Sequence, residues 1–309
     1  MESALAVDIG GTHTKVAQVN LRGEVVSATN LPTDLDGGAE AFVQRVADAA
    51  AEVINGNGAV GGVGLSVAGF VDSARTSITY NPNLRALEGY PLRNAFAQRF
   101  GVPAVLDVDS NAACLAEYHF GAGRGANRLL CLVLGTGFGG AMMIDGELVR
   151  FSAEAIGDPG HVIVEPGGPL CSCGGRGCAE ALVSAPAIAA AAGGGAVATG
   201  EGRAFADVVR LAGEGEAHSV QALRQAGYWL GIAMATLAAI FLPDRIVVAG
   251  GVAEAGDFLI EPAREAFRSS AGAILQRDLS ISKALLGWRA PLIGAACPLL
   301  IPASQGACS

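Results

Sequence analysis

The sequence predicts an α/β fold that is built from a duplicated unit, with two domains packed against one another around a cleft. Three observations support this prediction. The chain has 309 residues, which is more than one hydrophobic core usually serves. Short β-branched segments that end in glycine turns alternate with amphipathic helical segments. The order strand, glycine turn, strand occurs near residue 8 and again after residue 127, and no long linker separates the halves.

The first half is predicted to begin with three strands and to continue with alternating helices and strands. Strand patterns occupy residues 4–20, which include a tight turn, 24–31, 60–67 and 103–108. A helical spacing of apolar residues predicts an amphipathic helix over 39–54, through Phe42, Val46, Ala49 and Val53. Proline before and glycine after residues 92–100 predict a second, short helix there.

The second half repeats this plan. Residues 128–149 are again typical of strand, glycine turn and strand, and residues 244–256 echo residues 60–72 as a strand that enters a glycine turn. Helices are predicted over 204–212 and 220–242. The low-complexity residues 189–202 are interpreted as a helix end that continues into a flexible loop.

Charge and composition exclude several classes of partner. The formal net charge is -9, the sequence pI is about 4.9, and Lys15 and Lys283 are the only lysines. Such a chain is not expected to bind nucleic acid or anionic membranes, which require basic patches. The longest apolar run, Leu230 to Leu242, is too short to span a bilayer. The N-terminus lacks the pattern of an export signal, so the sequence predicts a cytoplasmic protein with reduced thiols.

Three of the seven cysteines lie close to a histidine in residues 160–180. His161, Cys171, Cys173 and Cys178 offer one nitrogen and three sulfurs, the donor set of a tetrahedral structural zinc site. Glycines between the cysteines allow the loop to fold around one ion. On spacing alone, reactive or incidental thiols stay open as an alternative.

Two glycine turns at strand ends could bind phosphate through their backbone N–H groups. They are the Asp8 to Thr12 turn and the Gly135 to Gly140 turn. Plain hairpins are the alternative for each. Gly135, Gly137 and Gly140 also match the dinucleotide-binding spacing, but the predicted continuation is a strand and not the helix that this site requires. No Walker A pattern is present.

Asp109 lies where the strand over 103–108 gives way to a predicted helix. This position would expose its carboxylate at the cleft, where it could act as a general base. Capping of the helix is the alternative, although Ser110 could take that role.

These motifs, in this order and spacing, resemble those of the ROK family of sugar kinases and related repressors. The matching segments are DIGGT, GLSVAGFVD, DVDSNAACLAE, LGTGFGGAMMIDG, GHV with CSCGGRGCAE, and VVAGGV, from about Leu5 to Ala296. The resemblance implies two actin-like (ribonuclease H-like) domains. It implies a small α/β domain over 1–110, a large α/β domain over 111–290 with the zinc loop, and a helix over 291–303 that packs back on the small domain.

The resemblance also assigns roles in ATP-dependent phosphoryl transfer. Asp109 matches the catalytic base, and Asp8 matches the residue that orients Mg²⁺, through water, with turn formation as its alternative role. Asn111 is expected to shape the catalytic turn. The phosphate-binding and nucleotide-binding positions are Gly10, Gly11, Thr12, Gly135, Thr136, Gly137, Gly250 and Gly251, although a simple strand-to-helix connection explains the last two nearly as well.

For the sugar, the resemblance implies a binding set that a structural Zn²⁺ braces. Asp158, His161 and Glu180 lie on or beside the zinc loop, and Gly69 and Asn83 come from the other domain, where both could equally be turn residues. A repressor of this family carries an extra DNA-binding segment before the first glycine turn, and here DIGGT begins at residue 8. A homodimer is compatible with the resemblance, because family members are often dimers.

Two departures from the family pattern concern the sugar. The residue before Asp109 is commonly Asn, whose amide reaches ring hydroxyls, and here it is Val108. The acid before Gly-His is usually Glu, and here it is Asp158. The sequence therefore predicts a kinase for the primary (6-) hydroxyl of a glucose-like hexose or amino sugar. The alternatives are a kinase for a cyclitol or N-acetyl hexosamine, and a non-catalytic sugar sensor of this family.

Overall fold

The computed structural model describes residues 2–56, 58–81, 83–151, 156–193 and 204–301. The chain divides into two compact units. The first comprises Met1–Arg124, Met143–Gly157 and Trp288–Ser309, and the second comprises Gly125–Met142 and Asp158–Gly287. These limits describe how densely the chain packs. The functional domain limits at 110/111 and 290/291 stay a prediction.

The first unit is built on a five-stranded mixed sheet in the order β3-β2-β1-β4-β7. The strands are β1 Ser3–Ile9, β2 His13–Asn20, β3 Val25–Pro32, β4 Val63–Val67 and β7 Ala104–Val108. The pairs β1/β2 and β2/β3 are antiparallel, and β1/β4 and β4/β7 are parallel. The strands predicted from residues 4–108 are therefore confirmed. The ends of β1, β4 and β7 lie at the same edge because these strands are parallel.

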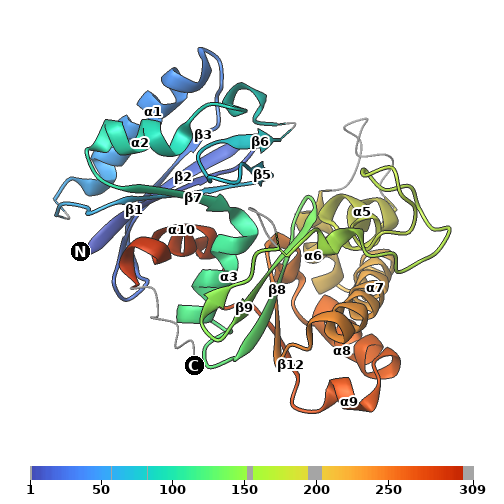
Figure 1. Cartoon of the computed structure of the whole chain (residues 1–309). Coiled ribbons are helices and arrows are strands. Elements are labelled where there is room, and N and C mark those ends of the chain that lie inside the picture. Colours follow the sequence, from blue (N-terminus) through green and yellow to red (C-terminus); the bar gives the residue numbers. More distant parts are fainter. Residues whose placement is uncertain (1, 57, 82, 152–155, 194–203, 302–309) are drawn as a thin grey trace. The chain divides into compact units, whose positions relative to one another are not determined.

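Helices cover both faces of this sheet (Figure 1), with α1 Gly38–Ile54 and α2 Leu92–Phe100 on one face and α3 Asp109–Phe120 and α10 Ala290–Leu300 on the other. Phe42, Val46 and Val53 of α1 are buried as predicted, but Ala50 is buried in place of Ala49, which is partly exposed. The apolar core of this unit joins α1 and α2 to the central strands. A short hairpin, β5 Phe70–Val71 and β6 Ile78–Tyr80, and the 3-10 turn η1 Arg85–Leu87 follow β4.

Close packing of α10 fixes the helix that begins at Asp109. A Cβ atom on Gly294 of α10 would lie 1.6 Å from the Ala112 carbonyl oxygen of α3, so only glycine allows this approach of the two backbones. The helix predicted over 291–303 thus corresponds to α10 up to Leu300, and residues 302–309 lie outside the described part of the chain.

The second sheet has the order β10-β9-β8-β11-β12. Its strands are β8 Arg128–Leu134, β9 Phe138–Ile144, β10 Glu147–Leu148, β11 Arg245–Ala249 and β12 Ser280–Lys283. Numbered within each sheet by chain order, both sheets read 3-2-1-4-5. This identity of strand order confirms the duplication predicted from the sequence. The strands β4 and β11, which both enter glycine turns, occupy the same position in their sheets.

The second unit carries most of the helices after residue 157. They are η2 Pro159–His161, α4 Glu180–Val183, α5 Ala185–Ala191, α6 Phe205–Gly213, α7 Ala217–Phe241, η4 Gly251–Ala255, α8 Asp257–Ser270 and α9 Ala273–Gln276. The helices predicted over 204–212 and 220–242 are confirmed as α6 and α7. The predicted loop after residue 193 lies outside the described residues up to residue 203.

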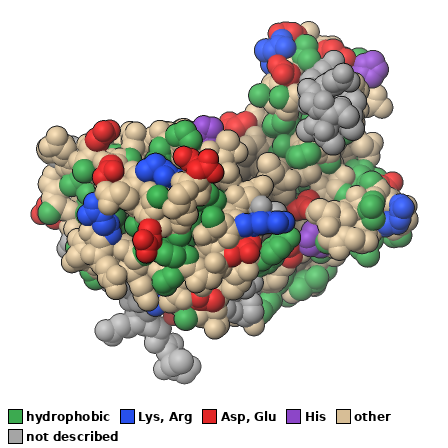
Figure 2. Space-filling view, turned by 90° about the horizontal axis from the view of Figure 1, so that it is seen from above, with side chains coloured by type: hydrophobic (Ala, Val, Ile, Leu, Met, Phe, Trp, Pro, Cys, Tyr) green, Lys and Arg blue, Asp and Glu red, His purple; other side chains and the backbone are tan. Residues whose placement is uncertain are grey.

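Surface properties agree with the acidic composition. The face in Figure 2 shows acidic and basic side chains interspersed with apolar ones, without an extended basic area. In the part of the chain that the structure describes, no helix combines the length and the apolar character needed to span a membrane.

Candidate active site and metal centre

The first glycine turn joins β1 to β2 and offers two backbone donors. Its carbonyl groups are held in place, because Thr33 donates its N–H to the Thr12 oxygen at 2.8 Å and its hydroxyl to the Gly10 oxygen at 2.8 Å. Within the described residues, the N–H groups of Gly11 and Thr12 have no hydrogen-bond partner, and both residues are exposed. Adjacent free N–H groups in a rigid turn are suited to an anion.

Asp8 is the last acidic residue before this turn and is only 8% exposed. The Ser66 hydroxyl donates to Asp8 Oδ1 at 2.6 Å, and Lys15 Nζ lies 3.2 Å from Oδ2. Both carboxylate oxygens are therefore held by side chains from the neighbouring strands β4 and β2. Turn formation alone does not require these bonds, so Asp8 is a pre-oriented carboxylate beside two free N–H groups.

Asp109 begins α3 at the carboxyl end of β7. Its Oδ1 accepts the N–H of the next residue, Ser110, at 2.7 Å, and the capping position before α3 is occupied by Val108 and not by Asp109. Burial of the carboxyl group, and then the negative charge of Asp8, raise the pKa of Asp109 from 3.8 to about 7. A carboxyl group with this pKa is suited to accept a proton near neutral pH.

A buried carboxylate two residues earlier organises the start of α3. Asp107 is 7% exposed, and its Oδ1 accepts the N–H of Val108 at 2.8 Å and the amide of Asn111 at 2.7 Å. Arg150 donates to both oxygens of Asp107, and Arg75 Nη1 lies 3.9 Å from Oδ2. Asn111 thus bonds to Asp107 across the start of α3, and its expected part in shaping a catalytic turn stays a prediction.

Val108 lies in the apolar core of the first unit. Its side chain is 4% exposed and joins the same cluster as Leu106 and Val67. Side chains alternate along a strand, so Val108 shares the face of Leu106 and not that of Asp107. Val108 therefore precedes Asp109 in the chain but exposes little of its own surface. Its contact with a sugar stays a prediction.

Gly69 and Asn83 lie on loops that meet at the first glycine turn. Gly69 has a φ of 94°, and a Cβ atom there would lie 2.6 Å from the Tyr80 carbonyl oxygen, so the turn itself requires glycine. Asn81 links the loops by donating to the Ala68 oxygen at 2.9 Å and accepting the Asn83 N–H at 2.8 Å. A Cβ atom on Gly11 would lie 2.9 Å from Asn83 Cβ, which places Asn83 against the phosphate turn.

Glu180 links the second glycine turn, between β8 and β9, to the cysteine loop, which carries Cys171, Cys173 and Cys178. The Glu180 carboxylate accepts the Phe138 N–H at 3.0 Å through Oε2 and the Ser172 hydroxyl at 2.9 Å through Oε1. The turn closes with the Gly135 N–H donating to the Gly137 oxygen at 2.9 Å. Thr136 at its tip is exposed. The chain continues as strand β9, which confirms that the glycines do not form a dinucleotide-binding turn.

Gly250 and Gly251 follow β11. Gly250 has a φ of 86°, and a Cβ atom there would lie 2.2 Å from the Leu134 carbonyl oxygen, so this position needs glycine for packing against β8. A Cβ atom on Gly251 would meet nothing within 4 Å. The strand-to-helix connection therefore explains Gly250, while Gly251 lies open at the start of η4.

The four predicted metal ligands lie together. The ligand atoms of His161, Cys171, Cys173 and Cys178 all lie within 4.8 Å of one another. Cys173 and Cys178 have their sulfurs 3.7 Å apart, and Cys171 Sγ lies 3.6 Å from His161 Nδ1. A tetrahedral zinc ion with bonds of about 2.3 Å to sulfur and about 2.0 Å to nitrogen separates these pairs by about 3.8 Å and about 3.5 Å. The residues present therefore fit zinc.

The histidine has a carboxylate partner. His161 Nε2 lies 3.3 Å from Asp158 Oδ2, which leaves Nδ1 directed to the sulfurs. A carboxylate on the second ring nitrogen is a common means of orienting a metal-binding histidine. Burial raises the pKa of Asp158, against the opposing charge of His161. The Asp158 side chain is still 39% exposed, so it could also contact a ligand.

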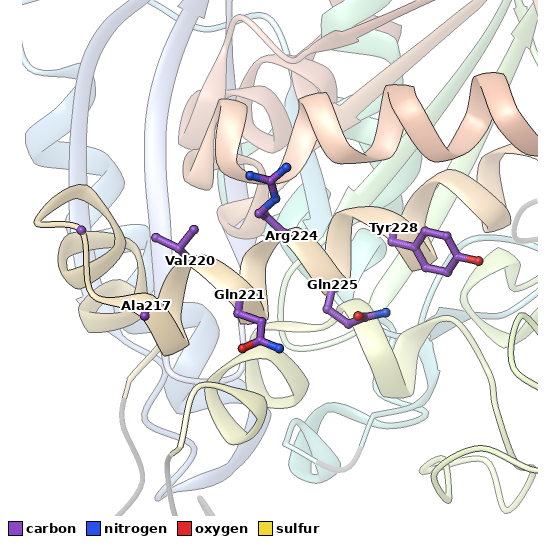
Figure 3. Close-up of a pocket in the computed structure, with 7 residues that line it drawn as sticks. Ala217, Val220, Gln221, Arg224, Gln225 and Tyr228 are labelled. Carbon is purple, nitrogen blue, oxygen red and sulfur yellow. The ribbon is translucent and has the colours of Figure 1, made fainter.

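A separate hollow of about 510 Å³ lies along one side of α7. Figure 3 shows that Val220, Gln221, Arg224, Gln225 and Tyr228 project from successive turns of this helix around it. Its lining includes no carboxylate and none of the predicted site residues, so it does not provide the groups that phosphoryl transfer requires.

The sequence analysis missed four residues that hold the predicted ones: Ser66, Lys15, Asp107 and Arg150. Lys15 had a signal, since it is one of only two lysines and follows the first glycine turn. Asp107 and Arg150 are 43 residues apart, and Ser66 and Asp8 are 58 apart, so no local pattern joins these pairs.

Comparison with known proteins is consistent with this geometry. A family model described as "ROK family" matches residues 4–300. The glucokinase of Streptomyces coelicolor is 32% identical, over 96% of this chain and 97% of its own length, and that of Thermotoga maritima is 34% identical, over 84% and 86%. The structure of a ROK family glucokinase from Streptomyces griseus in complex with glucose and AMPPNP superposes with a TM-score of 0.82. That protein is 33% identical, and the match covers 95% of this chain and 98% of that one.

Proposed function

The chain belongs to the ROK family and is a sugar phosphotransferase with the two-domain actin-like fold, and we propose that it transfers the γ-phosphoryl group of ATP to the primary (6-) hydroxyl of a glucose-like sugar. The observation that carries the proposal is the pair of carboxylates beside the first glycine turn, Asp8 and Asp109. One is held by side-chain partners, and the other has a pKa of about 7.

In the proposed reaction, Asp109 acts as the general base. Its carboxylate accepts the proton of the sugar hydroxyl while the hydroxyl oxygen bonds to the γ-phosphorus and the bond to the ADP oxygen breaks. A base contributes about 10²–10⁴-fold when its pKa lies near the working pH. Asp107 and Asn111 fix the first turn of α3, so the Asp109 backbone is held before substrate arrives.

The phosphates of ATP are proposed to bind at the two glycine turns. In the first unit, the free N–H groups of Gly11 and Thr12 supply donors, and Asp8 orients Mg²⁺ through water. Mg²⁺ neutralises charge on the phosphate oxygens when it is bound. The second unit has two turns that are proposed to bind the nucleotide. The positions in them that face open space are Thr136, between β8 and β9, and Gly251, after β11.

The cysteine loop is proposed to hold one structural zinc ion through His161 Nδ1 and the sulfurs of Cys171, Cys173 and Cys178. Zinc in a closed four-ligand site stabilises the loop and leaves no open position for a reactant. Glu180 bonds to both this loop and the second glycine turn, so the loop supports sugar-binding groups and nucleotide-binding groups together.

Sugar choice is proposed to depend on the carboxylate of Asp158. It is partly exposed and its pKa is raised by burial, so a cationic neighbour such as a ring amine would stabilise its charged form. We therefore propose that an amino-hexose is as good a substrate as glucose or better. The buried Val108 cannot replace the family's usual amide, and the demand for a hydroxyl at that point of the ring is relaxed.

A coupled assay of ADP release tests this function. Glucose, 2-amino and 3-amino glucose, N-acetyl hexosamines and a cyclitol are compared by kcat/KM with MgATP and metal-replete protein. We expect sugar-dependent ADP release with the amino-hexoses equal to or better than glucose. A strong preference for plain glucose would contradict the role of Asp158, and turnover of none of these sugars would contradict the kinase assignment.

A further inference from the structure

We propose that a small cavity in the first unit binds a phosphate group through Arg75 and Arg93. The cavity has a volume of about 120 Å³ and lies where β7, α2 and α10 meet the loop that joins β5 to β6. Pockets for drug-sized molecules begin at about 300 Å³, so this cavity admits a small oxyanion and not a nucleotide. Neither glycine turn lines it, so its occupant is distinct from the ATP of the proposed reaction.

Arg75 reaches the cavity from a preorganised loop. It lies between β5 and β6 with a φ of 51°, a left-handed conformation that is unfavourable for a side chain of this size. Asp72 holds the loop in this form, because its carboxylate accepts the N–H groups of Thr76 and Ser77 at 2.8 Å and 3.0 Å. The Arg75 side chain is 47% exposed. Its guanidinium group can therefore meet a ligand without a rearrangement of the loop.

Arg93 lies in the first turn of α2 and is fixed against the same loop. Its N–H donates to the Thr76 oxygen at 3.1 Å, and its Nη1 donates to the Ala74 oxygen at 2.8 Å. A guanidinium group has five N–H donors, so most of those of Arg93 are left for a ligand. No carboxylate of the described residues pairs with it. Two such planar groups in one cavity wall suit the tetrahedral oxygens of phosphate, which arginine binds in pairs.

The charges in the cavity wall favour an anion. Asp107 is the carboxylate there, and its oxygens already accept the Asn111 amide and both Nη groups of Arg150. Arg75 Nη1 lies 3.9 Å from Asp107 Oδ2, which is beyond hydrogen-bond length. The wall therefore carries two guanidinium groups, of Arg75 and Arg93, against one carboxylate that has a cationic partner of its own.

The alternative is that water alone fills the cavity and the two arginines only fasten the loop to α2 and β7. The two cases differ in the response to inorganic phosphate. Arginines that only hold the loop give the cavity no affinity for phosphate, and their substitution lowers the thermal midpoint alone. A binding site has a measurable Kd for phosphate that depends on each arginine.

The first experiment is a calorimetric titration of inorganic phosphate into protein saturated with Mg²⁺, a non-hydrolysable ATP analogue and glucose, so that the glycine turns are occupied. Sodium chloride at equal ionic strength is the control ligand. We expect one phosphate per chain, and a Kd about 10-fold to 100-fold higher in Arg75→Gln and in Arg93→Gln, as for loss of charge-assisted hydrogen bonds. Glucose 6-phosphate in the same titration distinguishes a phosphate ester from free phosphate as the source of the group.

The matched control variant is Arg99→Gln. Arg99 lies on the same helix as Arg93, is exposed, and does not line the cavity. Its substitution should leave the Kd for phosphate within twofold.

The second experiment uses the unaltered chain, so it does not depend on the folding of a variant. An aromatic 1,2-dicarbonyl modifies arginine: two guanidinium nitrogens bond to the two carbonyl carbons, each carbonyl becomes a hydroxyl, and a proton goes to buffer. At ten times its Kd, phosphate leaves about one tenth of the sites free. Modification of Arg75 and Arg93 should therefore slow about tenfold, and that of Arg99 should not change, as read by peptide mass spectrometry.

An unchanged Kd for phosphate in both Arg75→Gln and Arg93→Gln would overturn the proposal. So would the absence of phosphate binding by the natural protein, or modification rates that phosphate leaves unchanged at all three arginines. None of these results affects the kinase assignment, which the assay of ADP release tests separately.

Discussion

Replacement of Asp109 by Asn should remove activity and at the same time stabilise the protein at alkaline pH. Asp109 has a folded-state pKa of about 7 against 3.8 for the ordinary carboxyl group. A raised carboxyl pKa means that the folded state binds the proton more tightly, so the natural protein loses stability as the pH rises from 3.8 to 7. Asn is neutral throughout and avoids this loss.

The magnitude follows from the shift. About three pKa units at about 1.4 kcal/mol each set a ceiling of about 4 kcal/mol. Because water reaches part of this side chain, we expect Asp109→Asn to gain about 1–3 kcal/mol of unfolding free energy at pH 8, and almost nothing at pH 4. Turnover should fall by at least about 100-fold, as for loss of a general base, while ATP and sugar still bind.

Chemical denaturation at pH 4 and pH 8, without Mg²⁺ or substrate, measures the stability. Asp72→Asn is a control of opposite sign. Although burial opposes it, hydrogen bonds from Ser77 and Thr76 lower the pKa of Asp72 to about 2. That carboxylate stabilises the fold above pH 4 and loses this effect as the pH falls toward 2, so Asp72→Asn should destabilise the protein at pH 8.

The natural protein should also show the titration of Asp109 in its kinetics. With a pKa of about 7, the fraction of ionised base rises from about one tenth at pH 6 to about nine tenths at pH 8, so kcat/KM should rise about tenfold. Most of the activity surviving in Asp109→Asn, a flat profile from pH 6 to 8, or no gain in stability at pH 8 would each refute the reasoning.

Three further predictions concern the supporting residues. Removal of zinc by a chelator, or Cys173→Ser, should abolish sugar binding before ATP binding. Elemental analysis should find one zinc per chain, and an active preparation without metal would contradict the proposed zinc site. Arg150→Gln should lower kcat about tenfold or more with little change in either KM, because Asp107 then loses a charge-assisted partner; an unchanged kcat would exclude a positioning role. Val108→Asn should cost about 1–3 kcal/mol of stability from a buried amide; no loss in denaturation would show that the side chain reaches water or ligand.

The sequence predicted the elements well because their signals are local. The strand periodicity on either side of the turn in residues 4–20 and the Pro91 and Gly101 bracket around α2 act within single elements, and both were confirmed. The helical spacing from Phe42 to Val53 was confirmed except at Ala49, because Ala50 is buried in its place. Only the register and the order of strands, which depend on contacts distant in sequence, required the structure.

The site residues were harder to assign. Asp109, Asp8 and the Cys₃His set stand in motifs, and their roles stay predictions that the geometry supports. Val108 illustrates the limit, because alternation along residues 104–108 places it with Leu106 in the core, while its position in the motif suggested ligand contact. Glu180 was assigned to the sugar, yet its oxygens accept bonds from Phe138 and Ser172.

The most direct test of the central claim is an NMR measurement of the product from glucose labelled with carbon-13 at C6. Metal-replete protein, MgATP and the labelled sugar are incubated, and phosphorus coupling on C6 is observed together with ADP. We predict a C6 resonance split by phosphorus, in amounts that match the ADP formed, and none with Asp109→Asn over the same time. Binding of ATP and sugar without any phosphoester, or phosphorus on another carbon, would contradict the account.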